Sequence, residues 1–212
     1  MIDFHFDHIE HKYTLGNLVV PGVTSLLKPL TDYDNVPEFM LQRAAERGRN
    51  VHEACAYWIT GEGADEEQYT EEEWGYFTSF INWFHSEGNR LFKLQDERLV
   101  SERPMAHVRL RYGVTPDIII DGTAIIELKT RPYNKLVDPL QVAAQEEAWL
   151  FNGGKRVKGG YPKYVLELRK DGKYKLHNAH HAQVWSMFRY LLEHHWKCRE
   201  YQEKIEKWRK SK

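Results

Sequence analysis

The chain has 212 residues, of which 42% are hydrophobic and 13% aromatic, and its formal net charge is −1. This composition supplies enough apolar side chains for one folded domain, and without net positive charge any contact with nucleic acid must use local basic patches. Two cysteines, Cys55 and Cys198, exclude a disulfide framework and a four-cysteine zinc or iron–sulfur site within this sequence.

Neither export nor membrane insertion is predicted. The N-terminal residues have neither the basic nor the apolar stretch of a secretion signal, and no apolar run approaches the ~20 residues of a membrane span. We therefore expect a cytosolic protein without a membrane partner.

The first ninety residues predict a hairpin and three helices. A Gly16-Asn17 turn divides the hairpin, Pro37 precedes the longest helix, and Thr70 with Glu73 has the spacing of a capping box. The expected segments are residues 2–20 for the hairpin and 23–27, 38–60 and 70–86 for the helices.

The remainder predicts strands around a central hairpin, followed by helices and a further hairpin. Two apolar runs, 118–120 and 124–126, flank an Asp121-Gly122 turn and lack alternation, which predicts strands buried on both faces. The other expected segments are strands at 94–102 and 105–112, a helix over 138–151, a hairpin of 161–168 and 174–176, and a long helix from about residue 180. This order predicts an α/β (α+β) sandwich with a mixed central sheet. We expect one domain, with an N-terminal hairpin and helical part (about 1–90) and a core that carries the site (about 91–205).

Charged residues stand at the ends of the two central strands. Asp117 precedes the first strand, and Glu127 and Lys129 end the second. Two carboxylates and an ammonium can bind a divalent metal and activate water, which is the equipment for cutting a phosphodiester. The alternative interpretation is an exposed hairpin end with a Glu–Lys pair.

The length of the connecting turn decides whether the two carboxylates meet. A two-residue turn sets Asp117 opposite Ile126, on the face away from Glu127. A three-residue loop or a bulge sets Asp117 opposite Glu127. We predict the second arrangement.

These residues resemble the catalytic signature of the PD-(D/E)XK nuclease superfamily. Further segments are similar to its RecB-like branch and to phage-encoded exonucleases, although Gln145 stands where the branch has a tyrosine, and the cysteines of its iron–sulfur relatives are absent. The segments that carry the resemblance are Pro116-Asp117, Glu127-Leu128-Lys129, Gly48 to His52 on a helix, Glu102 on the strand before the hairpin, Gln141 to Gln145 on the next helix, and His11 to Leu26.

The resemblance implies a restriction-endonuclease-like core and a metal-dependent DNA nuclease. It favours an exonuclease in recombination, repair or DNA degradation, with one or two Mg²⁺ or Mn²⁺ ions and no iron–sulfur cluster. Its partners would be DNA and phage or host recombination proteins, in the bacterial host cytosol if the chain is phage-encoded. The oligomeric state stays open.

The resemblance also assigns roles to residues. Asp117, Glu127, the Leu128 carbonyl and His52 would hold the metal. Lys129 would orient or deprotonate the attacking water, and Gln141 would touch the phosphate or the water. Residues expected to support the site or contact DNA are Glu102, Gln145, Arg47 and Arg131. Further basic residues that flank the site in the sequence are Lys28, Arg43, Arg49 and Lys135.

Two other functions stay open. One is a nuclease-fold DNA-binding module without turnover, which the joint presence of Asp117, Glu127 and Lys129 disfavours. The other is a metal-dependent hydrolase or oxygenase that uses His52-Glu53 with a distant carboxylate. It would need a second histidine at ligand spacing, and the sequence shows none.

Overall fold

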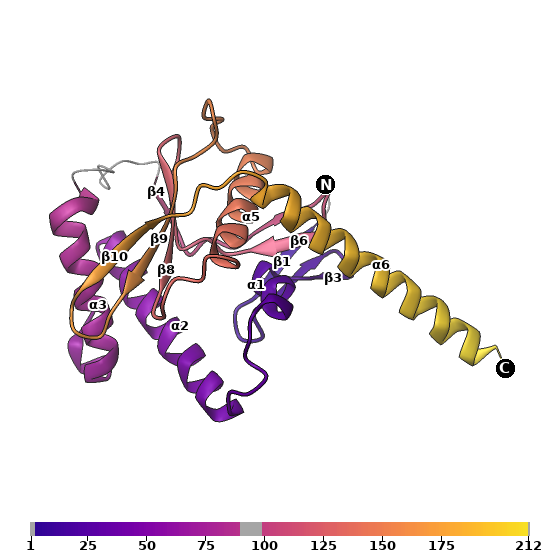
Figure 1. Cartoon of the computed structure of the whole chain (residues 1–212), viewed down its shortest axis with the longest axis horizontal. Coiled ribbons are helices and arrows are strands. Elements are labelled where there is room, and N and C mark those ends of the chain that lie inside the picture. Colours follow the sequence, from indigo (N-terminus) through magenta and orange to yellow (C-terminus); the bar gives the residue numbers. More distant parts are fainter. Residues whose placement is uncertain (1–2, 90–98, 212) are drawn as a thin grey trace.

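The computed structural model describes residues 3–89 and 99–211, and a mixed five-stranded sheet lies at its centre (Figure 1). The strand order is β10-β9-β8-β7-β4, in which β8 and β9 are parallel and the other neighbours antiparallel. The strands are β4 (Leu99–Ser101), β7 (Ile118–Ile120), β8 (Ala124–Lys129), β9 (Lys163–Leu168) and β10 (Tyr174–Asn178). The predicted α/β class with a mixed central sheet is confirmed.

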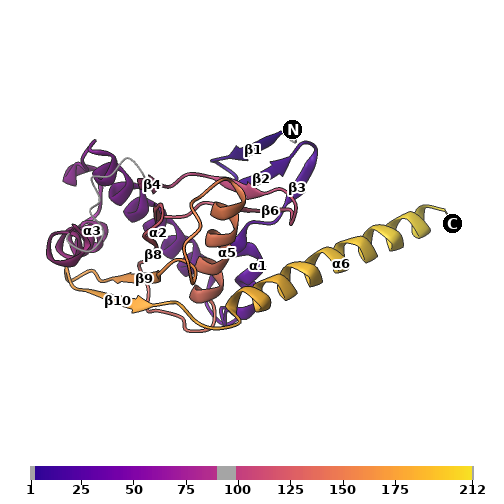
Figure 2. The ribbon, with the colours of Figure 1, turned by 90° about the horizontal axis from the view of Figure 1, so that it is seen from above.

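Helices cover both faces of this sheet, because both faces of its central strands are apolar (Figures 1 and 2). Ile119 and Ile125 belong to the core on the α5 side, whereas Ile118 and Ile126 belong to the core on the side of α2 and α3. All four are fully buried, as their unbroken apolar runs predicted. The helices are α1 (Val23–Leu27), α2 (Glu38–Thr60), α3 (Glu71–Trp83), α5 (Asp138–Phe151) and α6 (Val184–Lys210), and short helical turns occupy Lys28–Leu30, Glu66–Gln68 and Phe84–Gly88.

Local sequence signals explain where α2 and α3 begin and end. Pro37 is the N-cap of α2, and Gly61 ends this helix with a φ of +83°. Thr70 and Glu73 form the predicted capping box at the start of α3, each accepting the other's backbone N–H.

The N-terminal segment forms a three-stranded antiparallel sheet instead of the single hairpin expected. The predicted Gly16-Asn17 turn joins its last two strands, and a further turn over residues 8–11 adds a strand before them. Asp7 Oδ1 accepts hydrogen bonds from the N–H groups of Ile9 and Glu10 within that turn, which is a local contact that alternation does not reveal. The strands are β1 (Phe4–Asp7), β2 (Lys12–Leu15) and β3 (Leu18–Val20).

Residues 105–112 were expected as one strand, and this expectation is wrong. The chain reverses within the segment, because the N–H of Arg111 donates to the carbonyl of His107 and Arg111 has a φ of +59°. Gly113 then lies against the ring of Tyr13, where an added Cβ would be 2.1 Å from Cγ, so only glycine fits. The resulting hairpin consists of β5 (Met105–His107) and β6 (Tyr112–Val114).

The loop between β7 and β8 contains the three residues 121–123 and is held from outside the hairpin. Asp121 Oδ1 accepts hydrogen bonds from Trp149 Nε1 (2.9 Å), the Tyr161 hydroxyl (2.7 Å) and the Lys155 N–H (2.9 Å). These donors lie on α5 and on the segment before β9. They therefore tie the turn to the rest of the fold.

The last helix, α6, extends away from the body of the molecule (Figures 1 and 2). Its first half is anchored by the buried Phe188, Leu192 and Trp196. Among described residues 197–211, none is buried. Of the helices in the described part of the chain, none is both long and apolar enough to cross a membrane.

Asp121→Ala is expected to lower the free energy of unfolding by about 2–3 kcal/mol. The substitution removes three hydrogen bonds to a charged acceptor and leaves partly buried donors unpaired. Chemical denaturation followed by circular dichroism measures the change.

Asp171→Ala is the matched control. This aspartate lies in the β9–β10 loop and bonds only to the nearby Lys173 among its recorded contacts, so its loss should leave the denaturation midpoint nearly unchanged. Equal destabilisation by both substitutions would show that the turn is not held as described.

Candidate metal centre

The register of β7 and β8 brings the two predicted carboxylates to one face of the sheet. Ile118 pairs with Ile126, and the same register continued by one residue sets Asp117 opposite Glu127. The predicted arrangement of Asp117 opposite Glu127 is therefore confirmed, and a three-residue loop produces it. Both carboxylates are buried, with exposed fractions of 5% and 1%. The Leu128 N–H donates to Asp117 Oδ2 (2.6 Å), so the backbone of β8 orients the first carboxylate.

His52 of α2 and Glu102 approach Asp117 from two other parts of the chain. His52 Nδ1 lies 3.2 Å from Asp117 Oδ1 and 3.6 Å from Glu102 Oε1. One candidate ligand atom from each residue lies within 4.8 Å of the other two. A nitrogen and two carboxylate oxygens at this spacing fit a divalent cation such as Mn²⁺ or Mg²⁺.

Glu102 directly follows β4 instead of lying on the predicted strand, of which residues 94–98 fall outside the described residues. Its φ is +46°, a conformation that costs a residue with a Cβ about 1–2 kcal/mol. Its N–H donates to the Pro116 carbonyl (3.1 Å), and the Ser101 hydroxyl donates to the Asp117 carbonyl (2.9 Å). The fold therefore holds Glu102 beside Asp117 against its local preference, as is common at functional sites.

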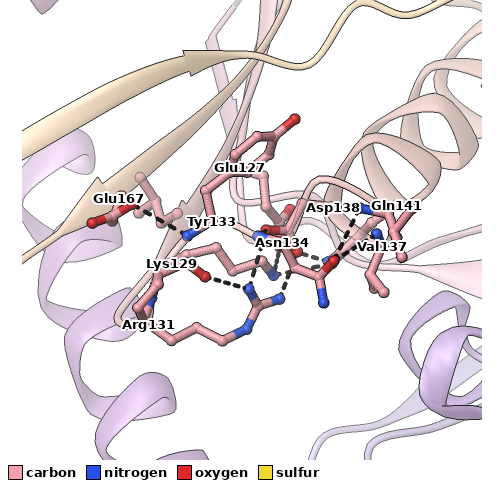
Figure 3. A network of polar contacts seen from close by, with 12 residues as sticks. Glu127, Lys129, Arg131, Tyr133, Asn134, Val137, Asp138, Gln141 and Glu167 are labelled. Atoms are coloured by element: carbon pink, nitrogen blue, oxygen red, sulfur yellow. Dashed lines mark hydrogen bonds and ion pairs between the residues drawn. The ribbon is translucent and has the colours of Figure 1, made fainter. Parts of the chain in front are cut away.

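The Glu127 carboxylate is bound by donors of the protein itself (Figure 3). Its Oε1 accepts from Lys129 Nζ and from Gln141 Nε2, both at 2.5 Å, and its Oε2 accepts from Gln145 Nε2. Lys129 Nζ also donates to Gln141 Oε1 (3.0 Å). Gln141 and Gln145 thus share one face of α5, as their spacing indicated. The candidate ligand group therefore consists of His52, Glu102 and Asp117, and Glu127, which was expected as a ligand, is not part of it.

Burial and charge shift the protonation of the site. Burial opposes the charged form of His52, but the Asp117 and Glu102 carboxylates outweigh it and raise the pKa of the imidazole well above its usual value. Burial raises the pKa of the Glu127 carboxyl to about 7, and Asp117 adds to this rise while the Lys129 ammonium opposes it. Burial also works against the Lys129 ammonium, yet Glu127 and Asp117 raise its pKa. The clustered carboxylates therefore favour the protonated forms of His52, Glu127 and Lys129, and a cation held by His52 would have to displace the imidazole proton.

The two arginines predicted at the site have partners within the fold. Arg131 binds Asp138 through two hydrogen bonds, at 2.5 and 3.1 Å (Figure 3). Arg47 pairs with Glu72 (3.3 Å) and donates to a backbone carbonyl after β8. Sequence reasoning used Asp138 only as a helix start, yet it is fully buried and positions Arg131. The sequence feature that drew attention to Asp138 was its position directly before Pro139 at the start of α5.

The site opens into a cleft of about 680 Å³, which we call the metal-site cleft. The lining includes the site residues Asp117, Glu127, Lys129, Gln141, His52 and Glu102. Residues of β1, of the β1–β2 turn, of α1 and of α2 line most of the rest of the cleft. Of the further basic residues, Arg49 lines this cleft, whereas Lys28 and Lys135 do not.

No protein-family model matches this chain, and no curated protein matches it. The resemblance to the PD-(D/E)XK nucleases therefore rests on the short motifs and on their order along the chain.

Asp117→Asn is expected to weaken Mn²⁺ binding by ~10²-fold or more, because a ligand charge is lost while the side chain keeps its shape. Electron paramagnetic resonance of free Mn²⁺ gives the dissociation constant. Asp171→Asn, which changes an exposed aspartate of the β9–β10 loop, should bind like the wild type. Unchanged affinity in the Asp117 variant would contradict the assigned site.

Proposed function

We propose that this chain is a metal-dependent deoxyribonuclease that hydrolyses phosphodiester bonds in DNA. The observation that carries the proposal is the three-residue β7–β8 loop, which aligns Asp117 with Glu127 and Lys129 beside His52 and Glu102. The arrangement lies in a solvent-open cleft, where a polymer backbone can reach it.

His52, Glu102 and Asp117 would hold the Mg²⁺ or Mn²⁺. When bound, such an ion polarises the phosphoryl oxygens and lowers the pKa of water. Lys129 Nζ, held between Glu127 Oε1 and Gln141 Oε1, orients the attacking water and offsets the charge that develops on phosphorus. The attacking water loses a proton as its oxygen bonds to phosphorus. The bond between phosphorus and the leaving sugar oxygen breaks, and that oxygen takes up a proton, so one water is consumed for each bond cut.

The donors around Glu127 support this assignment of roles. Gln141 and Gln145 hold its two oxygens, so Glu127 presents a fixed acceptor to the Lys129 ammonium. Fixed dipoles around a reacting centre do not have to reorganise during the reaction.

The finer features of the proposal come from the family resemblance. We infer exonucleolytic action in DNA recombination, repair or degradation, in the cytosol. The two free thiols, buried Cys55 and exposed Cys198, are compatible with a reducing compartment.

A DNA-binding module without turnover is the second candidate. One observation favours it: every oxygen of Glu127 already has a protein donor, so this part of the site is satisfied without an ion. An iron-dependent oxygenase receives less support, because the described ligand group has one histidine where the facial triad uses two.

Lys129→Met is expected to lower the rate of DNA cleavage by ~10²–10³-fold, since an ammonium at the reacting centre is lost. Gln141 and Gln145 remain as donors to Glu127, so the fold should persist. The measurement uses end-labelled linear DNA and closed circular DNA, with Mn²⁺ or Mg²⁺ and with chelator.

Lys170→Met, on the exposed β9–β10 loop, is the control and should cleave at the wild-type rate. Metal-dependent loss of linear DNA without loss of circular DNA supports an exonuclease. Cutting of circular DNA as well makes the enzyme an endonuclease. Wild-type protein that binds DNA but never cleaves it would replace the proposal with the binding module.

A further inference from the structure

A second cleft adjoins the metal-site cleft. Its volume is about 800 Å³, and it lies between the N-terminal half of α2, residues 33–36 and the end of β8. Gly48, His52 and Lys129 line both clefts. The ammonium assigned to the chemical step therefore stands where the two clefts meet.

Exposed apolar side chains line the second cleft, which we call the aromatic cleft. Phe39 is 69% exposed, Met40 51% and Tyr33 38%, and all three line it. The packing of the core does not account for these side chains, because they belong to neither core cluster. Exposed rings gathered beside a candidate site indicate a ligand with flat apolar faces.

Cations are interleaved with these rings. The lining includes four basic side chains. Three of them already have a carboxylate partner within the fold: Arg47 pairs with Glu72, Lys129 with Glu127 and Arg131 with Asp138. Arg43 keeps 80% of its side chain exposed and lies 3.8 Å from Glu72, so it can exchange this weak ion pair for a phosphate. Rings beside cations form the surface that single-stranded nucleic acids bind, with bases on the rings and phosphates on the cations.

Gly48 leaves the junction between the clefts uncovered. A Cβ added there would have only Thr130 Oγ1 within 4 Å, at 3.8 Å, so packing does not require glycine. In a helix interior glycine costs ~1 kcal/mol relative to alanine. The bare backbone of α2 at this point gives an extended strand room to pass from the aromatic cleft to Lys129.

We propose that the aromatic cleft binds unpaired DNA, so that the substrate of the site is single-stranded DNA. Bases stack on Tyr33 and Phe39, phosphates contact Arg43, and the strand crosses Gly48 to reach Lys129. Within a duplex both faces of each base are covered by its neighbours, so the rings that line the aromatic cleft can stack on successive bases only where the DNA is unpaired. This inference rests on the proposed nuclease function and specifies its substrate.

The test is the affinity of the protein, in chelator, for a fluorescent 2-aminopurine oligodeoxynucleotide and for the duplex of the same sequence. Wild type should bind the single strand more tightly and quench the 2-aminopurine on stacking. The double variant Tyr33→Ala/Phe39→Ala should bind the single strand ~10-fold more weakly or worse and lose the quenching. Both side chains are exposed, so the variant is expected to fold.

Tyr190→Ala/Tyr201→Ala removes two exposed tyrosines from α6, which line neither cleft, and should bind and quench like the wild type. A second variant, Gly48→Leu, should still quench 2-aminopurine in the aromatic cleft. Its rate of metal-dependent hydrolysis of the single strand should fall ~10-fold or more, because the leucine fills the junction between the clefts.

The outcomes separate this inference from the proposed function. Metal-dependent cleavage by a wild type that prefers duplex, or that is unaffected by Tyr33→Ala/Phe39→Ala, overturns the inference and leaves the nuclease intact. Ring-dependent binding of single strands without cleavage overturns the nuclease and leaves a single-strand binding cleft. No binding of either DNA overturns both.

Discussion

Three residues, rather than two, connect β7 to β8, and this number determines which side chains share a face of the sheet. Because side chains alternate along a strand, a slip of one residue would move Glu127 into the core beneath α2 and α3 and expel Ile126 from it. The bonds that Asp121 accepts from α5 and from the segment before β9 hold the turn that prevents this slip. The meeting of Asp117 with Glu127 depends on this register.

Burying two carboxylates next to each other would be costly without compensation, because an unpaired buried charge destabilises a fold by several kcal/mol. Each of the two has specific partners: the Leu128 N–H and His52 for Asp117, and Lys129 with two glutamines for Glu127. The donors come from β8, α2 and α5. The site therefore lies where three elements converge. The contacts that stabilise its buried carboxylates also hold these elements together.

Local signals made much of this structure predictable. The capping box at Thr70, the apolar runs of the central hairpin and the turn at Gly16 each act within a few residues, and each corresponds to an observed element. The pairing of Asp117 with Glu127 was predictable because only one register lets the two carboxylates share a face, although the sequence left open whether a three-residue loop or a bulge would set it.

The remainder depended on turn geometry and on contacts between distant segments. The reversal at Arg111 and the extra N-terminal strand arise from local turn hydrogen bonds, which leave no hydrophobic period in the sequence. The left-handed conformation of Glu102, which brings it to His52, has no signature in the residue itself. The bond from Gln145 to Glu127 was likewise invisible, because spacing indicated a shared helix face but not what that face contacts.

The central claim is that His52, Glu102 and Asp117 converge on one divalent cation at the end of the β7–β8 hairpin. Anomalous diffraction from crystals grown with Mn²⁺ tests this directly. The account predicts a manganese peak about 2.1 Å from one atom of each of these three residues. A well-ordered structure whose manganese lies elsewhere, or which binds none at saturating Mn²⁺, would contradict it.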